Sequence, residues 1–160
     1  MNPITHKAVP HAHIDMGILH LVIPQADIKS VELSSTIIPN KGCTPVVGYL
    51  HTLKYQWPVI VLDEDLHVQE KVSPHFRFIV CLETQCNQLR FAIPCRNVSK
   101  LSLNDEQISL PPAIKNTNIA ILSAHVIEDK LCFKTSADRL LTHLSEEHDL
   151  TSVLEDSSTC

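Results

Sequence analysis

The stretch GYLHTLKYQWPVIVLDEDL, residues 48–66, holds both tyrosines and the only tryptophan of this 160-residue chain. Its apolar part, residues 57–62, is typical of a buried strand but contains a proline. Because proline cannot donate to a sheet ladder, Pro58 is expected at the start of a strand or on a sheet edge. Alternate residues of the strand share a face: Trp57, Val59 and Val61 on one side, Ile60 and Leu62 on the other.

Short apolar runs alternate with turn-like breaks on both sides of this stretch, a rhythm typical of an all-β protein. The clearest pattern is a hairpin, in which apolar side chains alternate along residues 76–82 and 89–93 around a turn at 83–88. Further strands are expected at residues 97–103 and 118–127. This number of short strands favours barrels or sandwiches.

One helix is predicted near the C-terminus. Thr135 and Asp138 have the spacing of a capping box, and an apolar stripe follows them at Leu140, Leu141 and Leu144. The two ends of the chain lack such periodicity. Residues 1–15 are expected to be a flexible leader and residues 146–160 an acidic flexible tail, so the folded domain is predicted to span residues 16–145.

Composition and charge exclude several classes of function. The formal net charge is −5 and the basic residues are scattered, so no nucleic-acid partner is expected. No apolar run approaches the roughly 20 residues that span a bilayer, and direct membrane insertion is therefore not expected. The N-terminal residues lack the apolar core of a secretion signal, which predicts a cytoplasmic location.

The chain contains no recognisable catalytic set. Asp63, Glu64 and Asp65 are interpreted as a solvated turn and not as paired catalytic acids, and no glycine-rich phosphate loop occurs. His11 and His13 could chelate a divalent metal weakly during purification, which would not be a function. The sequence therefore predicts neither enzymatic activity nor a cofactor.

The cysteines leave one alternative open, a thiol or zinc site. Cys81 and Cys86 flank a hairpin turn with four residues between them, and Cys95 lies one strand later. Paired CxxC units are absent, so most cysteines are interpreted as small buried hydrophobic residues. The alternative function is a zinc- or thiol-binding protein that uses these three cysteines with a nearby histidine.

The order of the segments resembles the CheW-like domain family, the coupling module of bacterial chemosensory arrays. The likeness spans about residues 18–144, and it includes the predicted hairpin and the final strand and helix at 130–144. Pro58 follows Gly48 at the spacing typical of the family. The other residues that carry the resemblance are Ile23, Pro24, Ile28, Val31, Glu32, Pro39 and Pro45.

The resemblance implies a fold of two packed five-stranded SH3-like β-barrels with a short C-terminal helix, in which Pro24, Gly48 and Pro58 have structural roles. It also implies a non-enzymatic adaptor that couples a histidine kinase to chemoreceptors. The implied partners are the regulatory domain of a CheA-like kinase and the cytoplasmic tip of a methyl-accepting chemoreceptor.

The chain departs from the family at the turn that contacts partners. The family reads Asn-Leu-Arg-Gly where this chain has His51-Thr52-Leu53-Lys54, and Val61 replaces the aspartate that usually follows the proline strand. By position in the resemblance, residues 51–55 are expected to form an exposed turn. The expected partner-binding residues are His51, Leu53, Lys54 and Tyr55. In lacking this arginine, the chain is similar to divergent family members of the ChpC or PilI kind. These members belong to type IV pilus systems, which control twitching motility. A regulatory subunit that has lost partner binding is the other alternative.

Overall fold

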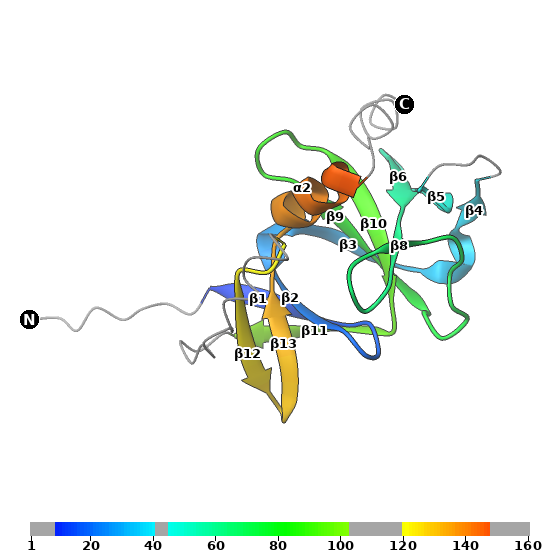
Figure 1. Ribbon diagram of the computed structural model, residues 1–160. Coiled ribbons are helices and arrows are strands. Elements are labelled where there is room, and N and C mark those ends of the chain that lie inside the picture. The colour runs from blue at the N-terminus through cyan, green and yellow to red at the C-terminus, as the bar shows by residue number, and fades with distance from the viewer. Residues whose placement is uncertain (1–8, 41–44, 103–119, 148–160) are drawn as a thin grey trace, which may run out of the picture.

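The structure, a computed structural model, describes residues 9–40, 45–102 and 120–147 (Figure 1). Two β-sheets form the framework of this part of the chain. The first sheet has five strands in the order β11 (Asn97–Ser102), β1 (Pro10–Asp15), β2 (His20–Pro24), β13 (Lys130–Lys134) and β12 (Ser123–Ile127). The second has six, in the order β3 (Ile28–Leu33), β9 (Phe78–Glu83), β10 (Arg90–Cys95), β6 (Gln56–Val59), β5 (Gly48–His51) and β4 (Ile38–Pro39).

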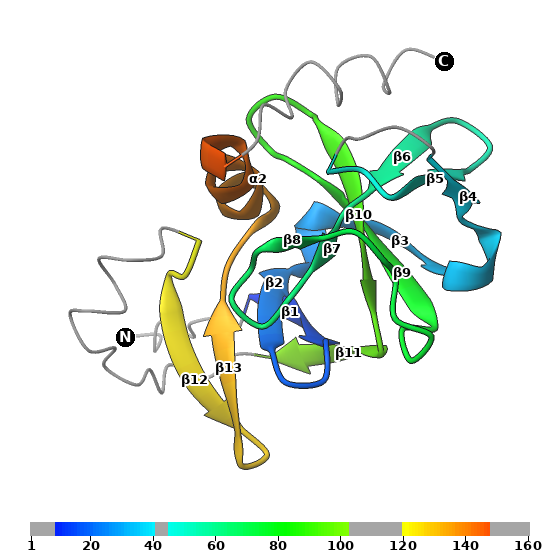
Figure 2. The same ribbon diagram turned by 45° about the vertical axis from the view of Figure 1, so that its right-hand side comes forward.

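Shorter elements connect and cover the sheets. Two strands form a separate ribbon, β7 (Val61–Leu62) and β8 (Val68–Gln69), and two 3-10 turns flank β3, η1 (Gln25–Asp27) and η2 (Ser34–Thr36). The helix α2 (Ala137–Glu147) lies beside the β9–β10 turn, while the β12–β13 hairpin extends away from the six-stranded sheet (Figure 2). No helix in the described ranges is long and apolar enough to cross a membrane.

Two apolar cores lie on opposite faces of the six-stranded sheet. Since alternate strand residues point to opposite faces, Val80 and Leu82 of β9 enter the larger core, while Ile79 and Cys81 enter the smaller one. The inner face of the five-stranded sheet and α2 complete the larger core through Ile14, Leu21, Ile23, Leu140, Leu141 and Leu144. The smaller core also holds Leu50, Trp57, Val59 and Ala92.

The predicted class, mainly β with one C-terminal helix, is confirmed. The predicted hairpin is also confirmed: β9 pairs with β10, from Phe78 opposite Cys95 to Glu83 opposite Arg90. The five-stranded barrels are not closed. Each sheet ends in edge strands that do not pair with each other in the described chain: β11 and β12 in the first sheet, β3 and β4 in the second.

The prediction of a flexible leader is wrong for residues 10–15, which form β1 between β2 and β11. Ala12 and Ile14 point into the protein and are buried, whereas the alternating His11 and His13 hid the apolar pattern in the sequence. At the other end α2 continues to Glu147, past the predicted domain boundary. The expectations for residues 1–8 and 148–160 lie outside the described residues.

The expected place of Pro58 is also wrong, since it is the third residue of β6, a strand paired on both sides. Hydrogen-bonded and non-hydrogen-bonded pairs alternate along an antiparallel ladder. The Thr52 N–H donates to the Tyr55 carbonyl (2.9 Å), which makes the pair Pro58 and Tyr49 a non-hydrogen-bonded one. On the other side, β6 pairs with β10 only from Val59 onward. No ladder bond therefore requires the missing N–H.

Helix α2 is present, but its predicted capping box is wrong. The Arg139 N–H donates to Ser136 Oγ (3.2 Å), so Ser136 caps the helix. Asp138 instead accepts a hydrogen bond from the Gln85 N–H (2.8 Å) in the β9–β10 turn. The Thr135 hydroxyl is buried and has no hydrogen-bond partner among the residues that the structure describes. The apolar stripe of the helix is buried as predicted.

Candidate functional site

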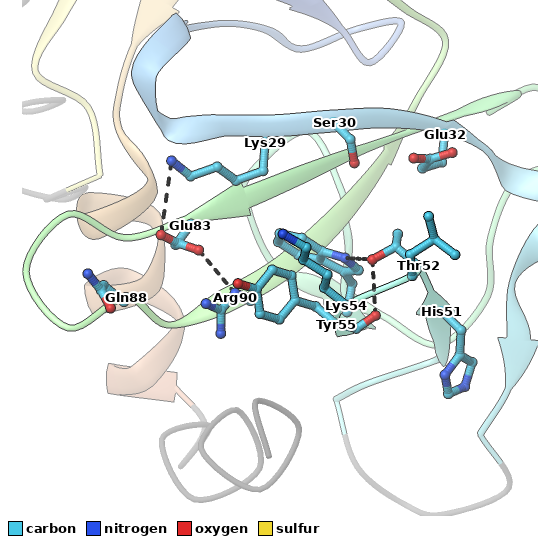
Figure 3. Close-up of a pocket in the computed structure, with 12 residues that line it drawn as sticks. Lys29, Ser30, Glu32, His51, Thr52, Lys54, Tyr55, Glu83, Gln88 and Arg90 are labelled. Atoms are coloured by element: carbon cyan, nitrogen blue, oxygen red, sulfur yellow. Dashed lines mark hydrogen bonds and ion pairs between the residues drawn. The ribbon is translucent and has the colours of Figure 1, made fainter. Parts of the chain in front are cut away.

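An open groove lies between β3 and the turn that joins β5 to β6, with a volume of about 1050 Å³ (Figure 3). Lys29, Ser30 and Glu32 of β3 form one wall, and the turn at residues 51–55 forms the other. Charged side chains of β9 and β10 close one end, and the Trp57 ring lies at its base. The groove opens over the smaller core, where the six-stranded sheet does not close into a barrel.

The turn is held in one conformation by hydrogen bonds. The Thr52 N–H and hydroxyl both donate to the Tyr55 carbonyl oxygen, at 2.9 and 3.2 Å. Trp57 Nε1, from the adjacent strand, donates to Thr52 Oγ1 (3.1 Å). The tip of the turn is exposed to solvent: Leu53 is 106 % exposed, and Lys54 is exposed beside it. An apolar side chain is thus presented to solvent on a rigid support.

A chain of charged and aromatic groups forms the groove end nearest the β9–β10 turn. The Arg90 guanidinium lies over the Tyr55 ring, 3.7 Å from the ring centroid, and Arg90 Nε is 3.0 Å from Glu83 Oε2. Lys29 Nζ lies 4.0 Å from the other Glu83 carboxylate oxygen. The Tyr55 ring also meets Trp57 edge to face, with centroids 6.0 Å apart. Tyr55 is therefore half-buried as a wall of the groove.

The structure places the predicted partner-binding residues together on this turn: His51, Leu53 and Lys54 are exposed, and Tyr55 is half-buried. Sequence reasoning missed Lys29, Glu83 and Arg90, which reach the same groove from other strands. Glu83 and Arg90 are directly opposite in the β9–β10 hairpin. Since opposite charges attract at such positions, the predicted hairpin register could have revealed this ion pair.

The family-motif residues support the fold around the groove. At Gly48, a Cβ atom would lie 2.6 Å from both the Ile37 side chain and the Ile38 carbonyl oxygen, so only glycine lets β4 approach β5. Pro24 ends β2 where the chain enters η1. Neither residue lines the groove.

The cysteines of the alternative metal or thiol site are not brought together. Cys81 belongs to the smaller core, Cys95 to the larger one, and Cys86 is exposed in the β9–β10 turn. Burial raises the pKa of Cys81 to about 11 and that of Cys95 to about 12, so both thiols stay protonated at neutral pH. The geometry gives the zinc or thiol hypothesis no site built from these three residues.

One acidic turn gathers three possible metal ligands in the described part of the chain. Asp63, Asp65 and His67 place their ligand atoms within 4.8 Å of one another. Asp63 Oδ1 accepts hydrogen bonds from the backbone N–H groups of Asp65 (2.9 Å) and His67 (2.8 Å). The cluster is therefore explained as the solvated turn that the sequence predicted.

Comparisons with known proteins bear on the fold. A scan against protein-family models found no match, and a search of curated proteins found none. Among solved structures, the chain is similar to the scaffolding protein TtCheW from Thermoanaerobacter tengcongensis, with a TM-score of 0.64. The two chains are 12 % identical, and the match covers 86 % of this chain and 90 % of TtCheW. This chain adopts a CheW-like fold, as the order of its sequence motifs predicted.

Proposed function

We propose that this protein is a non-enzymatic adaptor of a bacterial chemosensory system, in which it holds a histidine kinase and chemoreceptors in one assembly. The CheW-like fold supports this role, since the similar TtCheW is described as a scaffolding protein. The observation that carries the proposal is the fully exposed Leu53 on a turn fixed by hydrogen bonds. Binding surfaces commonly derive most of their affinity from a few apolar anchors that become buried, with polar residues around them.

The proposed contact surface consists of the turn residues His51, Leu53, Lys54 and Tyr55. Leu53 would be buried in the partner, and Lys54 would remain at the polar rim. Because the turn is already rigid, little conformational entropy is lost on binding. The partners we propose are the regulatory domain of a CheA-like kinase and the cytoplasmic tip of a methyl-accepting chemoreceptor.

We further propose that the protein acts in a type IV pilus chemosensory system and not in a flagellar one. The support is the turn itself, in which Leu53 and Lys54 stand where the family has arginine and glycine. An apolar side chain in place of an arginine implies a partner pocket that is apolar and not acidic.

The test is binding of purified kinase regulatory domain and receptor fragments from the same genome, measured by calorimetry. The double variant Leu53→Asp/Lys54→Glu is expected to lose about 1 kcal/mol or more of binding free energy, a factor of about five in affinity. The fold should be unaffected because both side chains are exposed. The matched control is Ile18→Asp, an apolar side chain that is 82 % exposed in the β1–β2 turn.

Two results would contradict the proposal. If the wild-type chain binds no kinase or receptor fragment at micromolar concentration, the adaptor role is wrong although the fold remains. If the double variant binds as tightly as the Ile18→Asp control, the turn is not the contact surface.

A further inference from the structure

Strand β3 forms one edge of the six-stranded sheet, and among the described residues no strand pairs with its other side. The Ser34 N–H donates to the Arg77 carbonyl (2.9 Å), which fixes the phase of the β3–β9 ladder. By the alternation of antiparallel pairs, Val31 then occupies a non-hydrogen-bonded position opposite Val80. Its N–H and C=O groups point away from β9, and they have no hydrogen bond in the described chain.

The two faces of β3 border two different grooves. Ser30 and Glu32 point into the groove described above, as Figure 3 shows. On the opposite face, Ile28 and Val31 line a smaller groove of about 360 Å³ between the two sheets. That groove is mainly apolar and also includes Ala12, Phe78 and Val98. Val31 itself remains 43 % exposed.

We propose that β3 binds an extended segment of a partner polypeptide as an additional strand of the sheet. The free backbone groups of Val31 would pair with the backbone of that segment. Successive side chains of a strand point to opposite faces, so those of the segment would enter the two grooves alternately. This inference deepens the proposed adaptor role, because the larger groove also borders the turn at residues 51–55.

The lining of the grooves defines the chemistry of the segment. Side chains facing Val31, Phe78 and Val98 are aliphatic, since these three residues form an apolar part of that groove. On the other face, Glu83 is already paired with Arg90 and Lys29, whereas Glu32 has no ion pair in the described chain. The segment therefore alternates aliphatic residues with basic or hydroxyl-bearing ones. A second copy of β3 fits less well, because it would bring a second Glu32 to the groove that Glu32 of this strand already lines.

The probe is a synthetic heptapeptide, Thr-Val-Lys-Val-Lys-Val-Thr, acetylated and amidated at its ends. We expect saturable binding by isothermal titration calorimetry and slower hydrogen exchange at the Val31 amide. Two further versions carry N-methyl groups, one on the valines and one on the other residues. The N–H groups of successive residues in a strand point to opposite edges, and only one edge of the probe pairs with β3. One methylated version should therefore lose binding, and the other should keep it.

Proline variants test the strand itself. Val31→Pro removes an N–H that β9 does not use, so the native ladder is preserved while the probe is expected to bind about tenfold more weakly. The matched control is Val126→Pro in β12, the edge strand of the other sheet, where Val126 is 57 % exposed. Val126 is likewise at a non-hydrogen-bonded position, next to the pair Ile127 and Lys130 that closes its hairpin. A second variant, Glu32→Lys, keeps the backbone intact and should weaken the basic probe.

The inference is overturned if the probe shows no saturable binding up to about 1 mM, or if Val31→Pro and Glu32→Lys both bind it as wild type does. A dimer of this chain that is abolished by Val31→Pro would also overturn it, since the occupant would then be a second copy. The two proposals fail separately. If Leu53→Asp/Lys54→Glu weakens kinase or receptor binding but the β3 variants change nothing, only the strand-addition inference is wrong. If the probe pairs with β3 while no kinase or receptor binds, only the adaptor role is wrong.

Discussion

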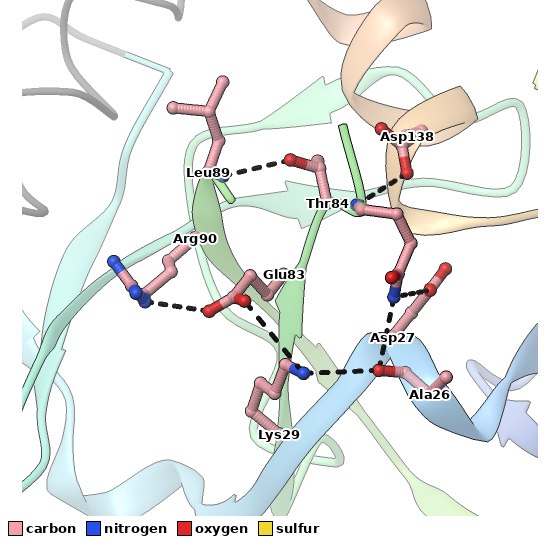
Figure 4. Close-up of polar contacts among 9 residues, drawn as sticks. Ala26, Asp27, Lys29, Glu83, Thr84, Leu89, Arg90 and Asp138 are labelled. Atoms are coloured by element: carbon pink, nitrogen blue, oxygen red, sulfur yellow. Dashed lines mark hydrogen bonds and ion pairs between the residues drawn. The ribbon is translucent and has the colours of Figure 1, made fainter. Parts of the chain in front are cut away.

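Asp27 links three parts of the chain that are far apart in sequence, and its removal should be costly. It is only 3 % exposed. Its Oδ2 accepts a hydrogen bond from the Ala137 N–H (2.9 Å), and its Oδ1 accepts one from Gln85 Nε2 (2.9 Å), the second of which is drawn in Figure 4. The Asp138 carboxylate accepts the Gln85 N–H in the same network. The start of α2 is thereby fixed to η1 and to the β9–β10 turn.

The expected loss for Asp27→Ala follows from these contacts. A hydrogen bond to a charged group contributes about 1.5–3 kcal/mol, and a buried N–H without a partner costs about 1–3 kcal/mol. The variant leaves the Ala137 N–H in that state. The variant also removes the desolvation cost of the buried carboxylate, which offsets part of this loss. We therefore expect the free energy of unfolding to fall by about 3 kcal/mol. Asp27→Asn retains a carbonyl acceptor for Ala137 and should lose about 1 kcal/mol.

Urea denaturation followed by fluorescence measures this loss, since Trp57 is the only tryptophan and is buried in the smaller core. With a slope of about 2 kcal/mol per M, the midpoint of Asp27→Ala should fall by about 1.5 M urea. Asp65→Ala, which removes an exposed carboxylate, is the control and should stay within about 0.5 kcal/mol of wild type. If Asp27→Ala loses less than about 1 kcal/mol, the network does not hold the helix as argued.

Three further predictions concern close packing, pH and thiol reactivity. Gly48→Ala should cost about 1–3 kcal/mol in urea denaturation, because its Cβ would lie 2.6 Å from the Ile38 carbonyl oxygen; an unchanged midpoint would rule out this close approach. Desolvation by burial lowers the pKa of His13 below 6.5, so the unfolded chain binds more protons and stability should fall as pH decreases below about 6.5. His13→Gln should reduce that pH dependence, and equal slopes would refute the assignment. Mapping of labelled thiols by mass spectrometry at neutral pH should find Cys86 modified in the folded chain and Cys81 only after unfolding; early labelling of Cys81 would contradict its burial.

Local patterns in the sequence were sufficient for the elements that bury an alternating or helical stripe. The β9–β10 hairpin and the apolar stripe of α2 were predicted because each apolar position contacts the core through its own strand or helix face. The order of such elements, with Gly48 and Pro58 at their spacing, was enough to predict the CheW-like fold. The exposed turn at residues 51–55 was predicted from its position in the CheW-like resemblance and not from a local pattern.

The groove and the positions that break local rules were decided by tertiary structure. β1 buries only two apolar residues, Ala12 and Ile14, and it is a strand because β2 and β11 pair with it on both sides. Asp27 meets the start of α2 from 110 residues away, a contact that no periodicity encodes. The groove combines side chains from β3, β9, β10 and the β5–β6 turn. Sequence periodicity records which face of an element is buried, whereas only the packing of strands far apart in the chain determines which side chains meet.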